Sequence, residues 1–111
     1  MIKVGEHITL DIIGTSKEYD PSLFEKVIHD IATAAKVTIL NISKYKFEPQ
    51  GFTILALLAE SHISFHTFPE KGIISFDFFT CGKVSPSIAT DGLIFPQVKK
   101  SKLIISFSGN V

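Results

Sequence analysis

The chain of 111 residues has no arginine, no tryptophan, a single cysteine and no formal net charge. Without arginine there is no rigid guanidinium group for bidentate contacts to phosphate or carboxylate. Zero net charge and an isoelectric point near 6.9 argue against nucleic acid as a partner. The single cysteine, Cys81, excludes an internal disulfide and is too few for a structural cysteine zinc site. These absences leave a small, neutral, globular protein.

No hydrophobic run approaches the roughly 20 apolar residues that a membrane span requires. The N-terminal segment MIKVGEHITLDIIG makes a poor signal peptide, because Glu6, His7 and Asp11 interrupt its apolar residues. We therefore expect a cytoplasmic protein with neither a membrane nor a nucleic acid as partner. Hydrophobic residues make up 45% of the chain, which is enough for one core in a single domain over residues 1–111.

The pattern of apolar residues predicts strands interrupted by two helices. Asp20 and Pro21 are a typical N-cap and first residue for a helix over residues 20–36, and Ser85-Pro86 begins a second, weaker one. Because the strands are bunched together, we expect an α+β fold, a two-layer α/β sandwich with a mainly antiparallel sheet. Aromatic residues on both faces of one strand suggest that two chains dimerise sheet to sheet. The predicted strands cover residues 3–13, 37–46, 52–59, 61–68, 73–80 and 102–108, with a turn at 69–72.

Polar side chains interrupt the most apolar part of the chain, LLAESHISFHTFPE at residues 57–70. A buried polar group without a partner costs about 1–3 kcal/mol, so this composition indicates a function. Strand periodicity places Ser61 and His66 on opposite faces, whereas the hairpin should bring Cys81 close to Ser61. The residue types alone are compatible with a hydrolase that uses a serine or cysteine nucleophile and a histidine base. No G-x-S-x-G elbow supports that interpretation.

The histidines do not predict a metal site by their spacing. His62 and His66 are four residues apart in a strand, which is too far for one shared ion unless the strand bends. We therefore expect no metal, and we expect His7, His29 and His62 to be mainly structural, although His62 is close enough to Ser61 to line a site there.

The segment LLAESHISFHTFPEKGIISFDFFTCG, residues 57–82, resembles the signature of the small prokaryotic S-adenosylmethionine decarboxylase proenzymes. The resemblance extends through KFEPQG and, more weakly, through ATAAKVTILNIS and the GEH near the N-terminus. It implies self-cleavage between Glu60 and Ser61 into a β chain, residues 1–60, and an α chain, residues 61–111. Ser61 would become a pyruvoyl group, a covalent cofactor that forms a Schiff base with the substrate amine.

The same resemblance implies roles for three catalytic residues. Ser61 would attack the carbonyl of Glu60, and His66 would transfer protons during this self-cleavage. Cys81 would protonate the substrate carbon after carbon dioxide leaves. A thiol suits that role, because its ordinary pKa of about 8.5 keeps it mostly protonated near neutral pH.

Three further residues would bind the substrate, S-adenosylmethionine. Phe47 and Phe68 match positions whose aromatic rings enclose the adenine, and Glu70 matches the acid that holds the ribose hydroxyls. The sequence departs from the common motif in having Phe68 in place of tryptophan and Thr53 in place of serine. An aromatic ring and a hydroxyl are nevertheless retained.

The predicted function is therefore the pyruvoyl-dependent decarboxylation of S-adenosylmethionine, which supplies the aminopropyl donor for spermidine and other polyamines. The resemblance also implies a homodimer of αβ protomers. Two alternatives stay open at this point. The same chemistry could act on arginine or ornithine, an option raised by Phe68, or the chain could be a regulatory paralogue that never cleaves.

Overall fold

The computed structural model describes residues 6–13 and 19–80. The first predicted strand, the first helix and the next four strands are all present, within two or three residues of their predicted ends. The predicted second helix at Ser85-Pro86 and the strand at 102–108 lie outside the described residues. In chain order, the elements are β1 (Glu6–Ile13), α1 (Pro21–Ala35), β2 (Ile39–Lys46), β3 (Phe52–Leu58), β4 (Ser61–Phe68), a 3₁₀ turn η1 (Pro69–Lys71) and β5 (Ile73–Thr80).

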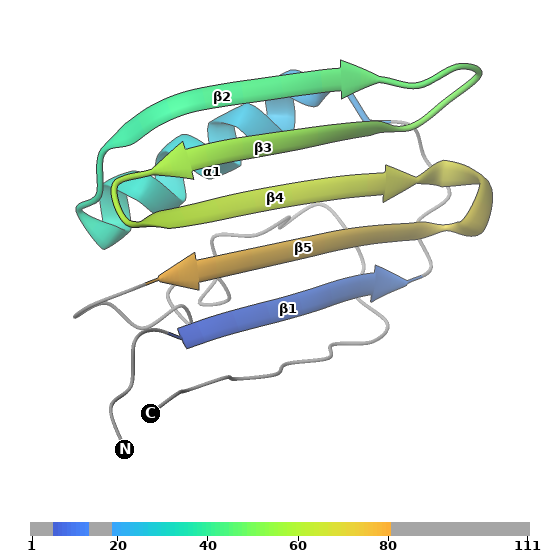
Figure 1. Ribbon diagram of the computed structural model, residues 1–111. Coiled ribbons are helices and arrows are strands. Elements are labelled where there is room, and N and C mark those ends of the chain that lie inside the picture. Colours follow the sequence, from blue (N-terminus) through green and yellow to red (C-terminus); the bar gives the residue numbers. More distant parts are fainter. Residues whose placement is uncertain (1–5, 14–18, 81–111) are drawn as a thin grey trace.

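The strands form one sheet in the order β1-β5-β4-β3-β2, and each neighbouring pair is antiparallel. β2 to β5 follow one another as a meander, whereas β1 pairs with β5, the last described strand (Figure 1). The prediction of an α+β fold with an antiparallel sheet is therefore confirmed. Among residues 6–13 and 19–80, α1 is the one α-helix, and it covers one face of the sheet.

Local sequence explains where α1 begins and ends. Asp20 has extended backbone angles, and its side chain accepts a hydrogen bond from the Ser22 backbone N–H at 3.0 Å. That bond lowers the pKa of the Asp20 carboxyl and satisfies one of the unpaired donors of the first turn. At the other end, Lys36 has a φ of 59°, in the left-handed region, which stops the helix one residue earlier than the pattern predicts.

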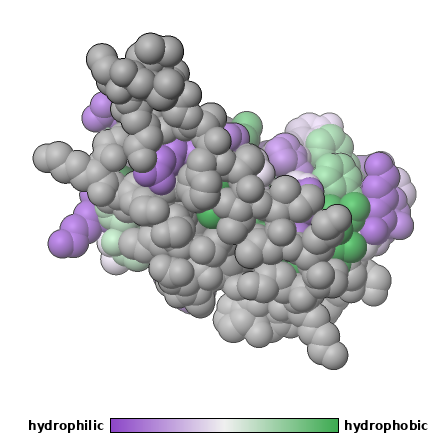
Figure 2. Space-filling view, turned by 90° about the horizontal axis from the view of Figure 1, so that it is seen from below, coloured by the Kyte–Doolittle hydropathy of each residue, from purple (hydrophilic) through white to green (hydrophobic). Residues whose placement is uncertain are grey.

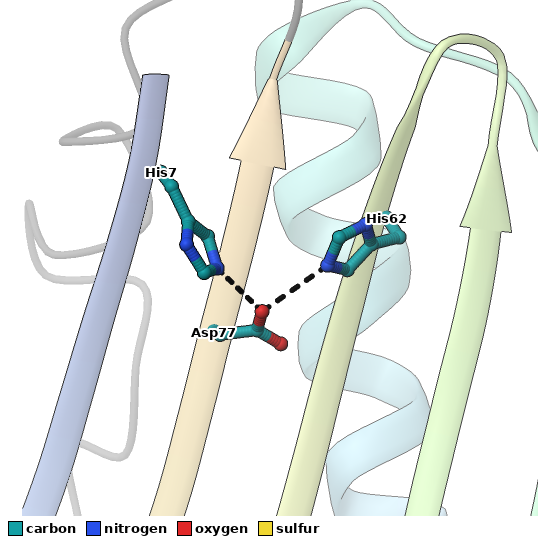
Figure 3. Close-up of side chains that lie close together, drawn as sticks. All are labelled: His7, His62 and Asp77. Carbon is teal, nitrogen blue, oxygen red and sulfur yellow. Dashed lines mark hydrogen bonds and ion pairs between the residues drawn. The ribbon is translucent and has the colours of Figure 1, made fainter. Parts of the chain in front are cut away.

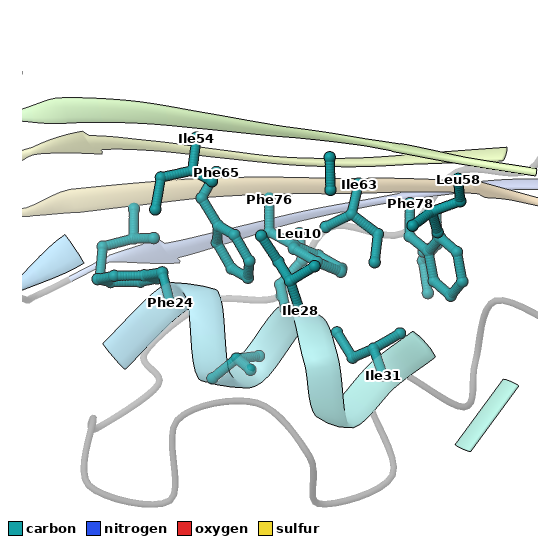
Figure 4. Packing of buried hydrophobic residues seen from close by; sticks show 14 of the residues in the cluster. Leu10, Phe24, Ile28, Ile31, Ile54, Leu58, Ile63, Phe65, Phe76 and Phe78 are labelled. Atoms are coloured by element: carbon teal, nitrogen blue, oxygen red, sulfur yellow. The ribbon is translucent and has the colours of Figure 1, made fainter. Parts of the chain in front are cut away.

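The core lies between α1 and the sheet (Figure 4). The ring of Phe24 packs at 5.1 Å from the rings of both Phe52 and Phe65. Ile28 and Ile31, both fully buried, extend this contact along the helix. In β3, β4 and β5 the buried apolar residues recur at every second position, so one face of each strand packs toward α1 and the other is more exposed, with the buried Ser64 as an exception on β4.

The open face of the sheet has two parts. Over β1, β5 and β4 it carries polar side chains, which the register aligns in rows across the three strands. Over β2 and β3 it carries Tyr45, Leu55 and Leu57, whose exposed fractions are 65%, 49% and 55%. Figure 2 views the molecule from the side on which β1 lies. Among the described residues visible there, hydrophobic ones (green) lie next to hydrophilic ones (purple).

No helix among the described residues is long and apolar enough to cross a membrane. The expected cytoplasmic location stays a prediction.

Candidate active site

The predicted cleavage point lies in the turn between β3 and β4. Leu58 pairs with Ser61, so Ala59 and Glu60 form a two-residue connection. Glu60 has a φ of 62°, a left-handed conformation that costs a residue with a Cβ about 1–2 kcal/mol. The peptide bond between Glu60 and Ser61 therefore directly follows a strained residue.

Ser61 begins β4 and lies on the helix-facing side of the sheet. Its exposed fraction is 8%, and it alternates with the fully buried Ile63 and Phe65. Its hydroxyl donates to the Ala59 carbonyl at 3.5 Å, the outer limit for a hydrogen bond. The Ser61 hydroxyl thus lies beside the backbone of the turn, and its weak hydrogen bond is easily broken.

His66 does not meet Ser61 within one chain. The two residues lie on opposite faces of β4, as the strand period predicted, and β4 pairs regularly with both of its neighbours. Five residues of a strand span roughly 17 Å. The Nδ1 atom of His66 lies 2.9 Å from the hydroxyl oxygen of Thr53 on β3, a contact that holds the ring in place.

Cys81 lies outside the described residues. The strand that precedes it, β5, ends at Thr80, and His62 pairs with Phe79. The end of β5 is therefore beside the start of β4, where Ser61 is located.

The three predicted substrate-binding residues lie together. Phe47, Phe68 and Glu70 line one pocket of about 290 Å³, and Thr53 and His66 contribute to its wall. The Nζ atom of Lys71 is 5.6 Å from the centroid of the Phe68 ring, within the range of a cation–π contact. The pocket thus combines aromatic faces, a carboxylate and an imidazole.

A second pocket, of about 270 Å³, lies on the other side of His66 on the open face. Asp11 and Ser75 line it, and the Ser75 hydroxyl donates to an Asp11 carboxylate oxygen at 2.8 Å. Ser64 and Asp77 complete its polar wall. His66 therefore borders both pockets, which makes it the central polar residue of this face.

Beside this second pocket, the structure brings together three residues that the sequence did not connect. The Nε2 atoms of His7 on β1 and His62 on β4 lie 2.5 Å and 3.1 Å from the same Asp77 oxygen on β5 (Figure 3). Ser64 donates to the other Asp77 oxygen. Burial raises the pKa of Asp77, but the hydrogen bonds from Ser64, His7 and His62 outweigh it and lower the pKa overall. Asp77 is therefore an ionised carboxylate.

The described residues form a five-stranded antiparallel sheet with one covering helix, and this α+β fold matches that of a solved decarboxylase. The chain is similar to the crystal structure of the adenosylmethionine decarboxylase from Aquifex aeolicus VF5, with a TM-score of 0.80 and 30% sequence identity. The match covers 100% of this chain and 95% of that one. A family model described as S-adenosylmethionine decarboxylase matches residues 6–96. The chain belongs to the S-adenosylmethionine decarboxylase family.

Curated relatives agree with this assignment. Three of them are each named S-adenosylmethionine decarboxylase proenzyme. The protein from Brevibacillus brevis is 40% identical over 93 residues, covering 81% of this chain and 70% of that protein. The protein from Methanococcus vannielii is 42% identical over 85 residues, covering 75% and 70%. The protein from Synechococcus sp. WH7803 is 47% identical over 81 residues, covering 71% and 63%. The family predicted from residues 57–82 is thus confirmed.

Proposed function

We propose that this chain decarboxylates S-adenosylmethionine through a pyruvoyl group that it makes from Ser61. Its family supports the reaction, and the term proenzyme in the names of its relatives supports activation by cleavage. The observation that carries the proposal is the position of Ser61, directly after a left-handed residue in a two-residue turn. When formed, the pyruvoyl group supplies a carbonyl that binds the substrate amine and withdraws electrons from the carbon losing carbon dioxide.

The chain's own atoms suit the cleavage step. The Ser61 hydroxyl attacks the Glu60 carbonyl, which replaces the amide by an ester and frees the Ser61 nitrogen. Loss of the Ser61 α-proton then expels the Glu60 carboxylate and leaves a dehydroalanine at position 61. That residue tautomerises, takes up water and releases ammonia, which leaves the pyruvoyl group at the new N-terminus. Release of the strained Glu60 conformation favours the forward direction by about 1–2 kcal/mol. The products are residues 1–60 and residues 61–111.

We propose further that the active enzyme is a homodimer of αβ protomers. His66 lies five residues from Ser61 along β4, a separation of roughly 17 Å within its own chain. Proton transfer at Ser61 by His66 therefore requires a second chain. The exposed Tyr45, Leu55 and Leu57 on the open face offer apolar area for such an interface.

In the proposed complex, the substrate binds in the pocket formed by Phe47, Phe68 and Glu70. The rings of Phe47 and Phe68 stack on the adenine, and Glu70 accepts hydrogen bonds from the ribose hydroxyls. The faces of Phe47 and Phe68 would also attract the positively charged sulfonium of the substrate through a cation–π contact. Cys81 donates the proton that replaces the carboxylate. The product would supply aminopropyl groups for spermidine.

The function is tested by trapping and by substrate comparison. Purified chain, after incubation, should separate into two fragments corresponding to residues 1–60 and 61–111 by intact mass. Borohydride reduction with S-adenosylmethionine should add mass to the C-terminal fragment alone. Carbon dioxide should be released from S-adenosylmethionine and not from arginine or ornithine. Release from a basic amino acid alone would overturn the substrate, and one uncut species would identify a non-cleaving paralogue.

The proposed contact between Phe68 and the substrate leads to a second prediction. Phe68→Ala removes a ring that stacks on the adenine in the proposed complex and should raise KM for S-adenosylmethionine about 5- to 150-fold, corresponding to about 1–3 kcal/mol of lost base–aromatic stacking. Because the ring does not touch the reacting carbon, kcat should change little. The matched control, Phe68→Tyr, keeps the ring and should retain a KM near that of the original chain. Equal KM values for all three proteins would remove Phe68 from the substrate site.

A further inference from the structure

We infer that His7, His62 and Asp77 form a binding site for one divalent transition-metal ion. The ligand atoms, one from each residue, all lie within 4.8 Å of one another. Each residue comes from a different strand, β1, β4 and β5, and these strands are neighbours in the sheet. Both imidazole Nε2 atoms point toward the carboxylate from its two sides (Figure 3). The three groups therefore converge on one point from a rigid support.

The separations of the ligand atoms are somewhat shorter than those around a bound ion, by about 0.3–0.9 Å. Ligand atoms bound to Zn²⁺ at about 2.0–2.2 Å in a tetrahedral site are roughly 3.4 Å apart. The Nε2 atoms of His7 and His62 lie 2.5 Å and 3.1 Å from the Asp77 oxygen, so small rotations open enough space for the ion. The side chains are 32%, 45% and 22% exposed, respectively, which leaves a route for entry. The fourth position would be filled by water.

Neighbouring residues fix the orientation of the ligands. Ser64 donates a hydrogen bond to the other oxygen of Asp77, which turns the carboxylate toward the two histidines. Phe79 lies between the histidines in the register, and its ring stacks on His62 at 5.9 Å and meets His7 edge-on at 6.2 Å. These contacts restrict both imidazole rings to orientations close to those that an ion needs. Binding would therefore cost little side-chain entropy.

The donor set indicates the class of ion. Two imidazole nitrogens and one carboxylate oxygen suit Zn²⁺, Co²⁺, Ni²⁺ or Fe²⁺. Mg²⁺ and Ca²⁺ prefer all-oxygen sites and are not expected here. The ion would connect β1 to β5 and β4, which should stabilise the folded chain because binding requires these strands to be in place. This inference needs no step of the proposed reaction, since all three ligands are present before any cleavage.

The test is metal binding by the full-length chain, measured with Zn²⁺ by calorimetry and with Co²⁺ by visible absorption. We expect one ion per chain and a higher Tm with Zn²⁺ than with chelator. His62→Ala and His7→Ala should each weaken Zn²⁺ binding by at least about tenfold. His29→Ala, which removes an exposed histidine on α1, should leave binding unchanged.

Two controls separate metal binding at these three residues from binding elsewhere on the chain and from loss of folding. The uncleavable Ser61→Ala chain should bind Zn²⁺ as tightly as the original, so a failure of the proposed reaction would not affect the result. Circular dichroism of each variant confirms folding. Undiminished affinity in both histidine variants, or binding abolished by Cys81→Ser but not by His7→Ala, would overturn the assignment. So would the absence of stoichiometric binding by the original chain.

Discussion

Ser61→Ala is expected to leave the chain uncut at its full mass of 12.2 kDa and without decarboxylase activity. The substitution removes the Ser61 hydroxyl, whose oxygen lies 3.5 Å from the Ala59 carbonyl. Without that oxygen no ester can form at Glu60, and without the cut no pyruvoyl group arises. Activity should therefore fall below detection rather than by a modest factor. Intact-mass measurement after prolonged incubation, together with a carbon dioxide release assay, checks both effects.

The matched control for this experiment is Ser43→Ala. Ser43 is an exposed serine on β2 whose hydroxyl donates to the Asn41 side chain, away from the turn. The Ser43→Ala chain should be cleaved normally. If the Ser61→Ala chain still separates into two fragments at the same bond, Ser61 is not the nucleophile and the proposed reaction is wrong.

A mixture of two inactive chains is expected to regain cleavage. A chain with His66→Ala should be cut far more slowly than the original, because the proton-transfer group is missing. A Ser61→Ala chain should not be cut at all. When the two are co-expressed with different tags, the His66→Ala chain should be cut, because its intact Ser61 is served by His66 of the partner chain. The separation of about 17 Å between these residues in one chain is the physical reason.

The measurement is which of the two tagged chains is cleaved. Cleavage confined to the His66→Ala chain in the mixture supports action across a dimer. No cleavage in the mixture would show that His66 acts within its own chain and would contradict the proposed arrangement. Rapid cleavage of the His66→Ala chain alone would remove His66 from the processing step.

Local patterns were sufficient to predict the elements between residues 6 and 80. Alternation marks the strands because one face packs against α1, and Asp20 with Pro21 marks the start of the helix. The pairing of β1 with β5 could not be predicted, since the paired residues Ile8 and Phe78 are far apart in sequence and no local signal joins them. Sheet order depends on that non-local contact.

The residues of the candidate site were likewise predicted only in part. The resemblance named Phe47, Phe68 and Glu70, and the structure places them in one pocket. The contact of His7 and His62 with Asp77 was missed, because it exists only when β1 lies beside β5. A signal was nevertheless present. Polar residues recur at every second position in three strands, and comparing those strands by face would have grouped them.

The order of the strands has a consequence for the mature molecule. β4 and β5 follow Ser61 but lie between β1 and β3, which precede it. After the proposed cut, β4 and β5 of the shorter polypeptide would pair on both sides with strands of the longer one, so each piece alone would lack the hydrogen-bonding neighbours of its strands. The pieces should melt apart together, at a temperature that rises with protein concentration, because refolding has become an encounter between two molecules.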